Sequence, residues 1–395
     1  MGYFDYDFLI DRLKKKFIIS FEEEADYFFS SPGRVEILGN HTDHNNGKVI
    51  VSAINIYLLA AVKKNKSNFV RVSYSDDDFI VIDLKDLKPK IEEISTSIAM
   101  IRGVLSGIIS NGYKISGFDA KIESMIPSGS GVSSSAAFEL VFCEICNILF
   151  NDGLISPLLK AQIAQNSEVN YFKKPCGLLD QMSISYGNIN YIDFLNPNMP
   201  VIKNIDYNFK EYKMILVNTL GSHSNLTNYY AEIMQDMKKI ANHFNVNILR
   251  EVDENEFYHS IKDLFQLFGG RAILRAIHYF EENKRVDSAL VALQNNDIDQ
   301  FLKLINDSCK SSYELLQNCY YPSDDFQGIT LGINLSRKIL RRGAVRVHGG
   351  GFAGTILAFV HEDDVNDYIT KMGSIFGQRS IFLINPSKEG TKLIK

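Results

Sequence analysis

Residues Ile126–Ala137 read IPSGSGVSSSAA, in which two glycines alternate with serines ahead of a run of three serines. Side chains this small let backbone N–H groups approach a ligand closely, and an apolar helical pattern begins at Ala136. A helix start adds unpaired N–H donors and the positive end of its dipole. The stretch therefore predicts an anion site, most naturally for nucleotide phosphates. The alternative is a flexible loop followed by a serine-capped helix.

Two familiar phosphate-binding motifs do not apply. No G-x-x-x-x-G-K-[ST] occurs, which excludes a P-loop enzyme. A G-x-G-x-x-G does occur at Gly349, Gly351 and Gly354, but its flanks, 344–348 and 355–360, both have strand patterns. Because a dinucleotide site requires a helix after the glycines, this motif predicts a glycine-rich turn between two strands.

Length and charge narrow the class of protein. A chain of 395 residues predicts two domains, 1–196 and 197–395, divided at the NPNMP segment Asn196–Pro200. A net charge of -5 without a long basic run argues against nucleic acid as a partner. No apolar stretch is expected to reach membrane-spanning length, and the N-terminus is no signal peptide. We therefore expect a cytoplasmic protein without a membrane partner, as a monomer or weak dimer.

Strand and helix patterns occur in both halves, which predicts an α+β fold. The five cysteines do not predict disulfides, and the C-x-x-C pair Cys143 and Cys146 lies in an apolar helical pattern where burial is expected. Strands are predicted at 49–51, 57–62, 69–72, 119–124, 212–218, 344–348, 355–360 and 380–384. Helices are predicted at 93–111, 136–150, 226–244, 261–281, 298–317 and 327–341.

A polar constellation occupies Ser31–Gly47, which is expected to form a loop bounded by glycines. His41, Asp43 and His44 suit metal ligation, an ordinary polar loop, or a sugar, whose hydroxyls need several fixed donors and acceptors. Arg34 adds a permanent cation able to stabilise a transferring phosphoryl group.

Carboxylates form a third group of candidates. Pro175–Met182 (PCGLLDQM) places Asp180 after a tight turn. Asp180 is either an acceptor for a hydroxyl proton in phosphoryl transfer or a carboxylate that stabilises a helix start. Glu168, upstream of it, is either a second carboxylate for Mg²⁺ or an exposed helix residue.

Together these segments resemble the GHMP kinase superfamily and, within it, the galactokinase family. Gly33–Asn46 is similar to the galactokinase sugar-binding signature, Pro127–Ala137 to the nucleotide-phosphate loop, and Val347–Thr355 to the glycine-rich C-terminal motif. Cys176–Gln181 matches the block that carries the family's catalytic Asp, and His223–Tyr230 resembles the block with a sugar-contacting Tyr. The resemblance covers roughly residues 25–390, with the motifs in the family's order.

The resemblance implies a ribosomal-protein-S5-like N-terminal domain and a ferredoxin-like C-terminal domain, with ATP over the serine-rich loop and the sugar between the domains. It implies an ATP- and Mg²⁺-dependent kinase for the anomeric hydroxyl of galactose, with Asp180 and Arg34 as catalytic residues. The implied sugar contacts are Asn40, His41, Asp43, Gly177 and Tyr230. The implied nucleotide contacts are Gly129, Ser130, Gly131, Ser133, Ser134 and Ser135, and the implied Mg²⁺ ligands are Ser135 and Glu168.

Four positions depart from the family pattern: Asn40 stands where Glu is usual, His44 where Tyr is usual, Glu36 where Asn is usual, and Lys173 where Gly is usual. The family's Glu reaches the C6 end of the sugar, so the neutral Asn40 is expected to tolerate a C6 carboxylate better. A C6-modified galactose such as galacturonate is the alternative substrate. A third hypothesis is a regulator that binds sugar and ATP without turnover.

Overall fold

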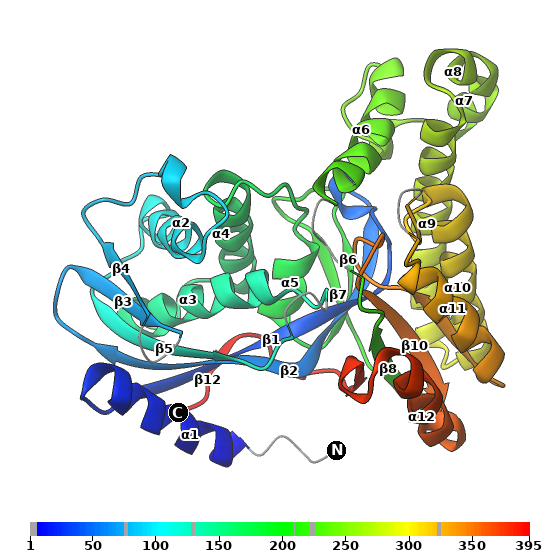
Figure 1. The fold of residues 1–395 in the computed structure, drawn as a ribbon. Helices are drawn as coiled ribbons and strands as arrows, with labels where there is room; N and C mark the ends of the chain where they lie inside the picture. The colour runs from blue at the N-terminus through cyan, green and yellow to red at the C-terminus, as the bar shows by residue number, and fades with distance from the viewer. Residues whose placement is uncertain (1–5, 75–77, 128–130, 209, 222–225, 322–324) are drawn as a thin grey trace.

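The chain folds around two β-sheets, each covered by helices (Figure 1). The computed structural model describes residues 6–74, 78–127, 131–208, 210–221, 226–321 and 325–395. The strands of the larger sheet are β1 (Tyr27–Leu38), β2 (Lys48–Lys64), β3 (Phe69–Ser73), β4 (Phe79–Asp83), β5 (Phe118–Ser124), β6 (Ile189–Asp193), β7 (Val201–Ile205) and β12 (Lys392–Leu393). The strands of the smaller sheet are β8 (Tyr212–Asn218), β9 (Gly343–Val347), β10 (Thr355–His361) and β11 (Ile381–Ile384). This mixture of helices and strands confirms the predicted α+β class.

The larger sheet runs in the order β12-β1-β2-β5-β3-β4, and β6 and β7 extend it beside β2. The smaller sheet runs β11-β8-β10-β9. The helices are α1 (Tyr6–Phe21), α2 (Ser97–Ser110), α3 (Ser134–Asn151), α4 (Pro157–Asn170), α5 (Leu179–Tyr186), α6 (Thr227–His243), α7 (Glu254–His259), α8 (Ile261–Phe268), α9 (Gly270–Gln294), α10 (Ile298–Ser311), α11 (Gly328–Ile339) and α12 (Val365–Phe376).

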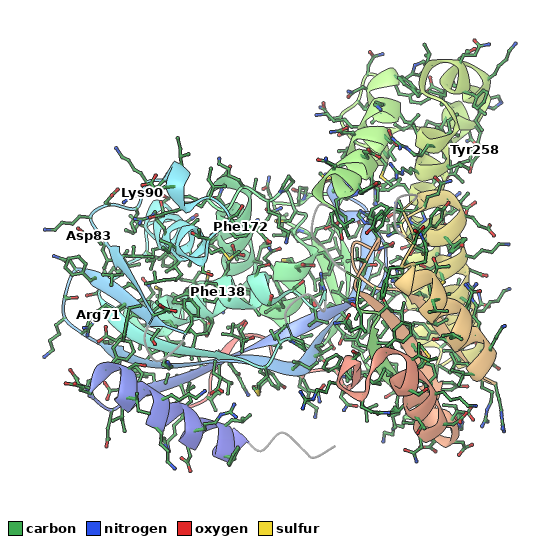
Figure 2. All side chains as sticks on the ribbon, in the orientation of Figure 1. Arg71, Asp83, Lys90, Phe138, Phe172 and Tyr258 are labelled. Carbon is green, nitrogen blue, oxygen red and sulfur yellow. The ribbon has the colours of Figure 1, made fainter. Side chains whose placement is uncertain are left out.

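The long strand β2 is apolar along much of its length because both of its faces are covered. Leu59 and Ala61 pack with α1 on one face, whereas Ala60 and Val62 join the core under α2, α3 and α4 on the other. Figure 2 shows side chains filling this second layer, with Phe138 of α3 among them. The position of α3 matters most for the site, because the serine-rich segment leads directly into its first turn.

Several predicted elements have different limits in the structure. The predicted helix 261–281 is divided because Gly269 adopts φ 74° and ends α8, after which α9 continues to Gln294. The predicted helix 298–317 ends at Ser311 and is followed by a π-helical turn, Ser312–Leu316.

The strands of the first half also differ from the prediction. Runs 49–51 and 57–62 are parts of one strand, β2, and residues 31–38, expected in a loop, belong to β1. The register of β1 against β2 shifts at Pro32/Gly33 and again at Glu36/Leu38, so polar residues and proline interrupt the sequence pattern without ending the strand.

Helix α3 corrects one further expectation. It spans 18 residues and is apolar enough to cross a membrane by length and composition, although no such stretch was expected. In the folded chain 78% of it is buried, as in a core helix. Cys143 and Cys146 are free and buried in this helix, as predicted.

The larger sheet takes strands from both sides of Asn196. Strand β7 pairs with β6, and β12 returns from the far end of the chain to pair with β1. The hydroxyl groups of Ser31 and Thr391 lie 2.8 Å apart beside this pairing. The division into domains at 196/197 stays a prediction.

Candidate active site

The centre of the candidate site is an arginine–aspartate pair that joins three segments. Arg34 projects from β1, and its Nε donates to Oδ1 of Asp180 over 2.7 Å. Its Nη1 donates to the carbonyl oxygen of Gly131 over 2.5 Å. Ser133 Oγ donates to the other carboxylate oxygen of Asp180. Three segments therefore meet at the Asp180 carboxylate: the segment Gly33–Asn46, the serine-rich loop and the first turn of α5. The side chain of Asp180 remains 30% exposed.

Asp180 is held in its ionised form. Burial alone would raise its pKa, but the charge and hydrogen bond of Arg34, the hydrogen bond of Ser133 and the charge of Lys174 hold the pKa below its usual value. An ionised carboxylate of low basicity is a strong hydrogen-bond acceptor and a weak proton acceptor. Asp180 lies in the first turn of α5, and both of its carboxylate oxygens are engaged by side chains outside that helix, Arg34 and Ser133.

Gly131 sits where the chain enters the site. It adopts φ 71°, and a Cβ there would lie 3.0 Å from Thr355 Oγ1 and 3.6 Å from His348 Nδ1. Helix α3 starts at Ser134, just behind it, so its N-terminal end faces the segment predicted to bind phosphates. The side chain of Ser134 is exposed, and the predicted contacts Gly129 and Ser130 lie outside the described residues.

Ser135 and Glu168 come together as the two predicted metal ligands. Ser135 Oγ donates to Glu168 Oε1 over 3.0 Å, and Glu168 is only 1% exposed, so it is not the exposed helix residue of the alternative interpretation. Mg²⁺ is usually held by one or two protein oxygens, with phosphate oxygens and water completing its octahedron. Among the residues that the structure describes, no three His, Cys, Asp or Glu side chains form a metal cluster, and this includes His41, Asp43 and His44. The donor pair fits a metal that arrives with a nucleotide.

Three predicted sugar contacts converge on the glycine motif. The carbonyl oxygens of Gly349–Gly351 accept, in chain order, from Asn40 Nδ2 (2.8 Å), from His41 Nε2 (3.0 Å) and from the Tyr230 hydroxyl (3.1 Å). Burial lowers the pKa of His41 to about 4, so its ring is neutral and its proton lies on the nitrogen that faces the carbonyl. The turn between β9 and β10, predicted from its flanking strands, thus holds the segment Gly33–Asn46 in place through its carbonyl oxygens.

Asp43 and Gly177 fit against each other. A Cβ on Gly177 would lie 1.7 Å from Asp43 Oδ2, so only glycine lets this carboxylate lie against the turn before α5. Burial, followed by repulsion from Asp180 and Glu36, raises the pKa of Asp43 to about 7.

Asn40 is wholly buried and its amide is fully engaged. Besides the glycine turn, Nδ2 donates to Glu36 Oε1 over 3.0 Å, and Oδ1 accepts from Asn318 Nδ2 (2.8 Å) and Ser312 Oγ (3.2 Å). Glu36 is itself paired with Arg346 at 2.9 Å. Asn40 can contact a sugar hydroxyl only by exchanging one of these hydrogen bonds.

Sequence reasoning missed several residues of the site. His348 accepts the backbone N–H of Glu36 at Nε2 over 3.2 Å, and burial together with the charges of Arg34 and Arg346 lowers its pKa well below the usual value. Its ring is therefore neutral, with the proton on the nitrogen nearer Gly131. Its place inside the glycine motif was a usable signal, whereas Asn318 belongs to no motif.

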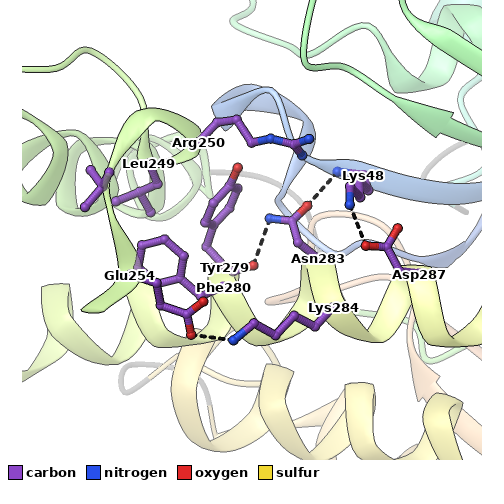
Figure 3. A pocket seen from close by; sticks show the side chains of 10 residues that line it. Lys48, Leu249, Arg250, Glu254, Tyr279, Phe280, Asn283, Lys284 and Asp287 are labelled. Carbon is purple, nitrogen blue, oxygen red and sulfur yellow. Dashed lines mark hydrogen bonds and ion pairs between the residues drawn. The ribbon is translucent and has the colours of Figure 1, made fainter. Parts of the chain in front are cut away.

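A separate cavity of about 300 Å³ lies between Lys48 and helix α9 (Figure 3). Each cation that lines it is paired with a carboxylate, so its walls offer no unpaired positive charge to a ligand. The pairs are Lys48–Asp287 (2.5 Å), Arg250–Asp193 (3.0 Å) and Lys284–Glu254 (2.6 Å). None of the predicted site residues lines this cavity.

Comparisons with known proteins show which proteins this chain resembles. Residues 15–64 match the galactokinase galactose-binding signature, and residues 99–188 match the GHMP kinases N terminal domain. A galactokinase of Clostridium tetani is 31% identical, with 97% of each chain covered, and one of Clostridium acetobutylicum is 30% identical, with 98% of this chain and 99% of that protein covered. A crystal structure of Lactococcus lactis galactokinase with galactose superposes with a TM-score of 0.83 at 22% identity, covering 97% of this chain and 99% of that one. Methanococcus jannaschii mevalonate kinase superposes with a TM-score of 0.63 at 15% identity, covering 93% and 98%.

Proposed function

This chain belongs to the galactokinase family, and from that premise we propose that it transfers the γ-phosphoryl group of ATP to the anomeric hydroxyl of galactose. The observation that carries the proposal is the junction of Arg34, Asp180 and Gly131, which sets a cation and an ionised acceptor beside the segment predicted to bind phosphates. A regulator without turnover has no need of this arrangement, which favours the kinase over the regulator.

Asp180 and Arg34 do most of their work by positioning. The exposed part of the Asp180 carboxylate accepts the hydrogen of the anomeric hydroxyl and aims its oxygen at the γ-phosphorus. Because the pKa of Asp180 is low, the proton moves to it late, when bonding to phosphorus has made the hydroxyl acidic. Arg34 stabilises the charge on the transferring group. Ser135 and Glu168 would hold Mg²⁺, which when bound neutralises charge on the phosphates.

The direct test is to incubate the purified protein with ATP, Mg²⁺ and a panel of free sugars that includes galactose and galacturonate. ADP release is measured with a coupled assay, and ³¹P NMR identifies the phosphorylated position. We expect ADP release with galactose and a phosphate on C1. Absence of ADP release with every sugar, or a phosphate at another carbon, would contradict the proposal.

The pH dependence of kcat/KM should reflect the ionisation of the Asp43 carboxyl. Its pKa of about 7 means that the carboxyl is largely protonated at pH 6 and ionised at pH 8. The ionised form accepts charge-assisted hydrogen bonds from sugar hydroxyls, so kcat/KM for galactose should rise between pH 6 and pH 8 with an apparent pKa near 7. Asp43→Asn should lower kcat/KM and remove this rise. A rise that persists in Asp43→Asn would assign it to another group.

Asn40 should determine how the C6 end of the sugar is tolerated, but a single substitution disturbs its network. Asn40→Glu would place a second buried carboxylate beside Glu36, which should cost about 3 kcal/mol of the free energy of unfolding. The exchange variant Glu36→Asn/Asn40→Glu again pairs one amide with one carboxylate and should recover most of that loss.

The exchange variant, which keeps the pairing of one amide with one carboxylate, is therefore the variant in which specificity for the C6 end of the sugar is tested. Its kcat/KM for galactose relative to galacturonate should rise about tenfold, since a carboxylate at position 40 repels a C6 carboxylate. Thermal unfolding establishes that the variant is folded. An unchanged ratio in a stable exchange variant would show that position 40 does not sense C6.

A further inference from the structure

The carboxylate of Glu168 is saturated by side-chain donors. Oε1 accepts from Ser135 Oγ (3.0 Å) and from Lys174 Nζ (2.7 Å). Oε2 accepts from Gln181 Nε2 (2.8 Å) and from the thiol of Cys176 (3.5 Å). Glu168 can therefore ligate a metal only after one of these donors has left.

Lys174 is the donor best able to leave. Its side chain is 53% exposed, whereas Gln181 is wholly buried. It is also the one cation among the four donors, and it shares Oε1 with Ser135, the other predicted metal ligand. An ammonium group and a divalent cation on the same carboxylate oxygen repel each other strongly, so the two exclude each other there.

The Lys174 ammonium stays close to the site after it leaves Glu168. Lys174 is fixed by its backbone, whose N–H donates to the carbonyl of Glu168 over 3.0 Å. From this anchor its charge already acts to lower the pKa of Asp180, which contacts Arg34 and Ser133, and that of Tyr230, which contacts the glycine turn. A flexible lysine leaving Glu168 therefore stays within the site and meets the densest negative charge that enters it, the phosphates of the nucleotide.

We propose that Lys174 occupies the metal position on Glu168 in the free protein, leaves when magnesium and ATP bind, and then contacts the phosphates. This inference rests on the proposed function for the identity of the nucleotide. It assigns two opposite effects to one side chain: Lys174 weakens metal binding to the free protein and strengthens binding of the nucleotide.

The test compares Lys174→Met, which keeps the length of the side chain and removes its charge, with Lys173→Met at the neighbouring exposed lysine. Mn²⁺ binding to each protein without nucleotide is measured by water-proton relaxation. Binding of a non-hydrolysable ATP analogue to protein already saturated with Mn²⁺, from which Lys174 has been displaced, is measured by titration calorimetry. Neither measurement requires sugar or turnover, so failure here is distinguishable from failure of the proposed kinase activity.

In Lys174→Met, Mn²⁺ should bind about tenfold more tightly, and the ATP analogue should bind the Mn²⁺-saturated protein about tenfold more weakly, as expected for the loss of one charged hydrogen bond on each side. Lys173→Met should change neither by more than about twofold. A merely structural role for Lys174 would weaken both ligands together. Weakening of both, unchanged Mn²⁺ affinity, or an equal response in Lys173→Met would overturn the proposal.

Discussion

Asp180→Asn should lower kcat by about 10³-fold or more while ATP affinity changes by less than about threefold. The amide keeps the volume of the side chain but loses the charge that attracts the anomeric hydroxyl hydrogen and finally takes its proton. It also presents an NH₂ group to partners that are themselves donors, Arg34 Nε on one side and Ser133 Oγ on the other. Stopped-flow or coupled assays give kcat, and calorimetry gives the affinity for ATP.

Asp119→Asn is a matched control. Asp119 is also a buried carboxylate paired with an arginine, Arg71, but it lies on β5 away from the site. We expect Asp119→Asn to lower stability and to leave kcat within about twofold. Asp180→Asn retaining more than a tenth of the normal kcat would contradict the role assigned to Asp180.

Gly131→Val should abolish useful ATP binding, with an affinity at least about 100-fold lower. A β-branched residue at φ 71° is strained, and its Cβ would press on Thr355 Oγ1 at 3.0 Å. The carbonyl of Gly131 would then move away from Arg34, which the native loop holds at 2.5 Å. Calorimetric titration with ATP measures the loss directly.

Gly112→Val is the control that separates the effect of backbone strain from an effect on the ATP site. Gly112 also has a positive φ, 82°, but a Cβ there would meet nothing within 4 Å. This variant should lose comparable stability to Gly131→Val and keep its affinity for ATP. If the two variants bind ATP equally well while folded, Gly131 does not border the phosphates.

The motifs of the sequence predicted much of the site, because each motif carries its chemistry in neighbouring residues. Ser133 precedes helix α3 and Ser135 lies in its first turn, directly after the glycines, and Asp180 lies three residues after Gly177. The turn around Gly349–Gly351 also followed from its flanking strands.

The sequence could not predict which side chains face one another across the fold. Asn40 looked like an open sugar contact, yet Asn318 bonds to it from 278 positions away. Burial and partners of this kind depend on the packing of two sheets, and no local pattern encodes them. The same limit applied to β1, in which polar residues at Arg34 and Glu36 suggested a loop although both are buried. Lys174 stood beside a quoted motif, but only its distance to Glu168 revealed its importance.

The pairing of β12 with β1 bears on how the protein is made. Strand β1 carries Arg34, and its outer edge at Phe29–Ser30 is covered by Lys392–Leu393, with Ser31 reaching Thr391 across 360 positions of sequence. During synthesis on the ribosome, that edge stays open until both halves of the chain have emerged. An uncovered strand edge is a template for pairing with other chains. Nascent chains stalled before residue 391 should therefore be the species that depends most on chaperones.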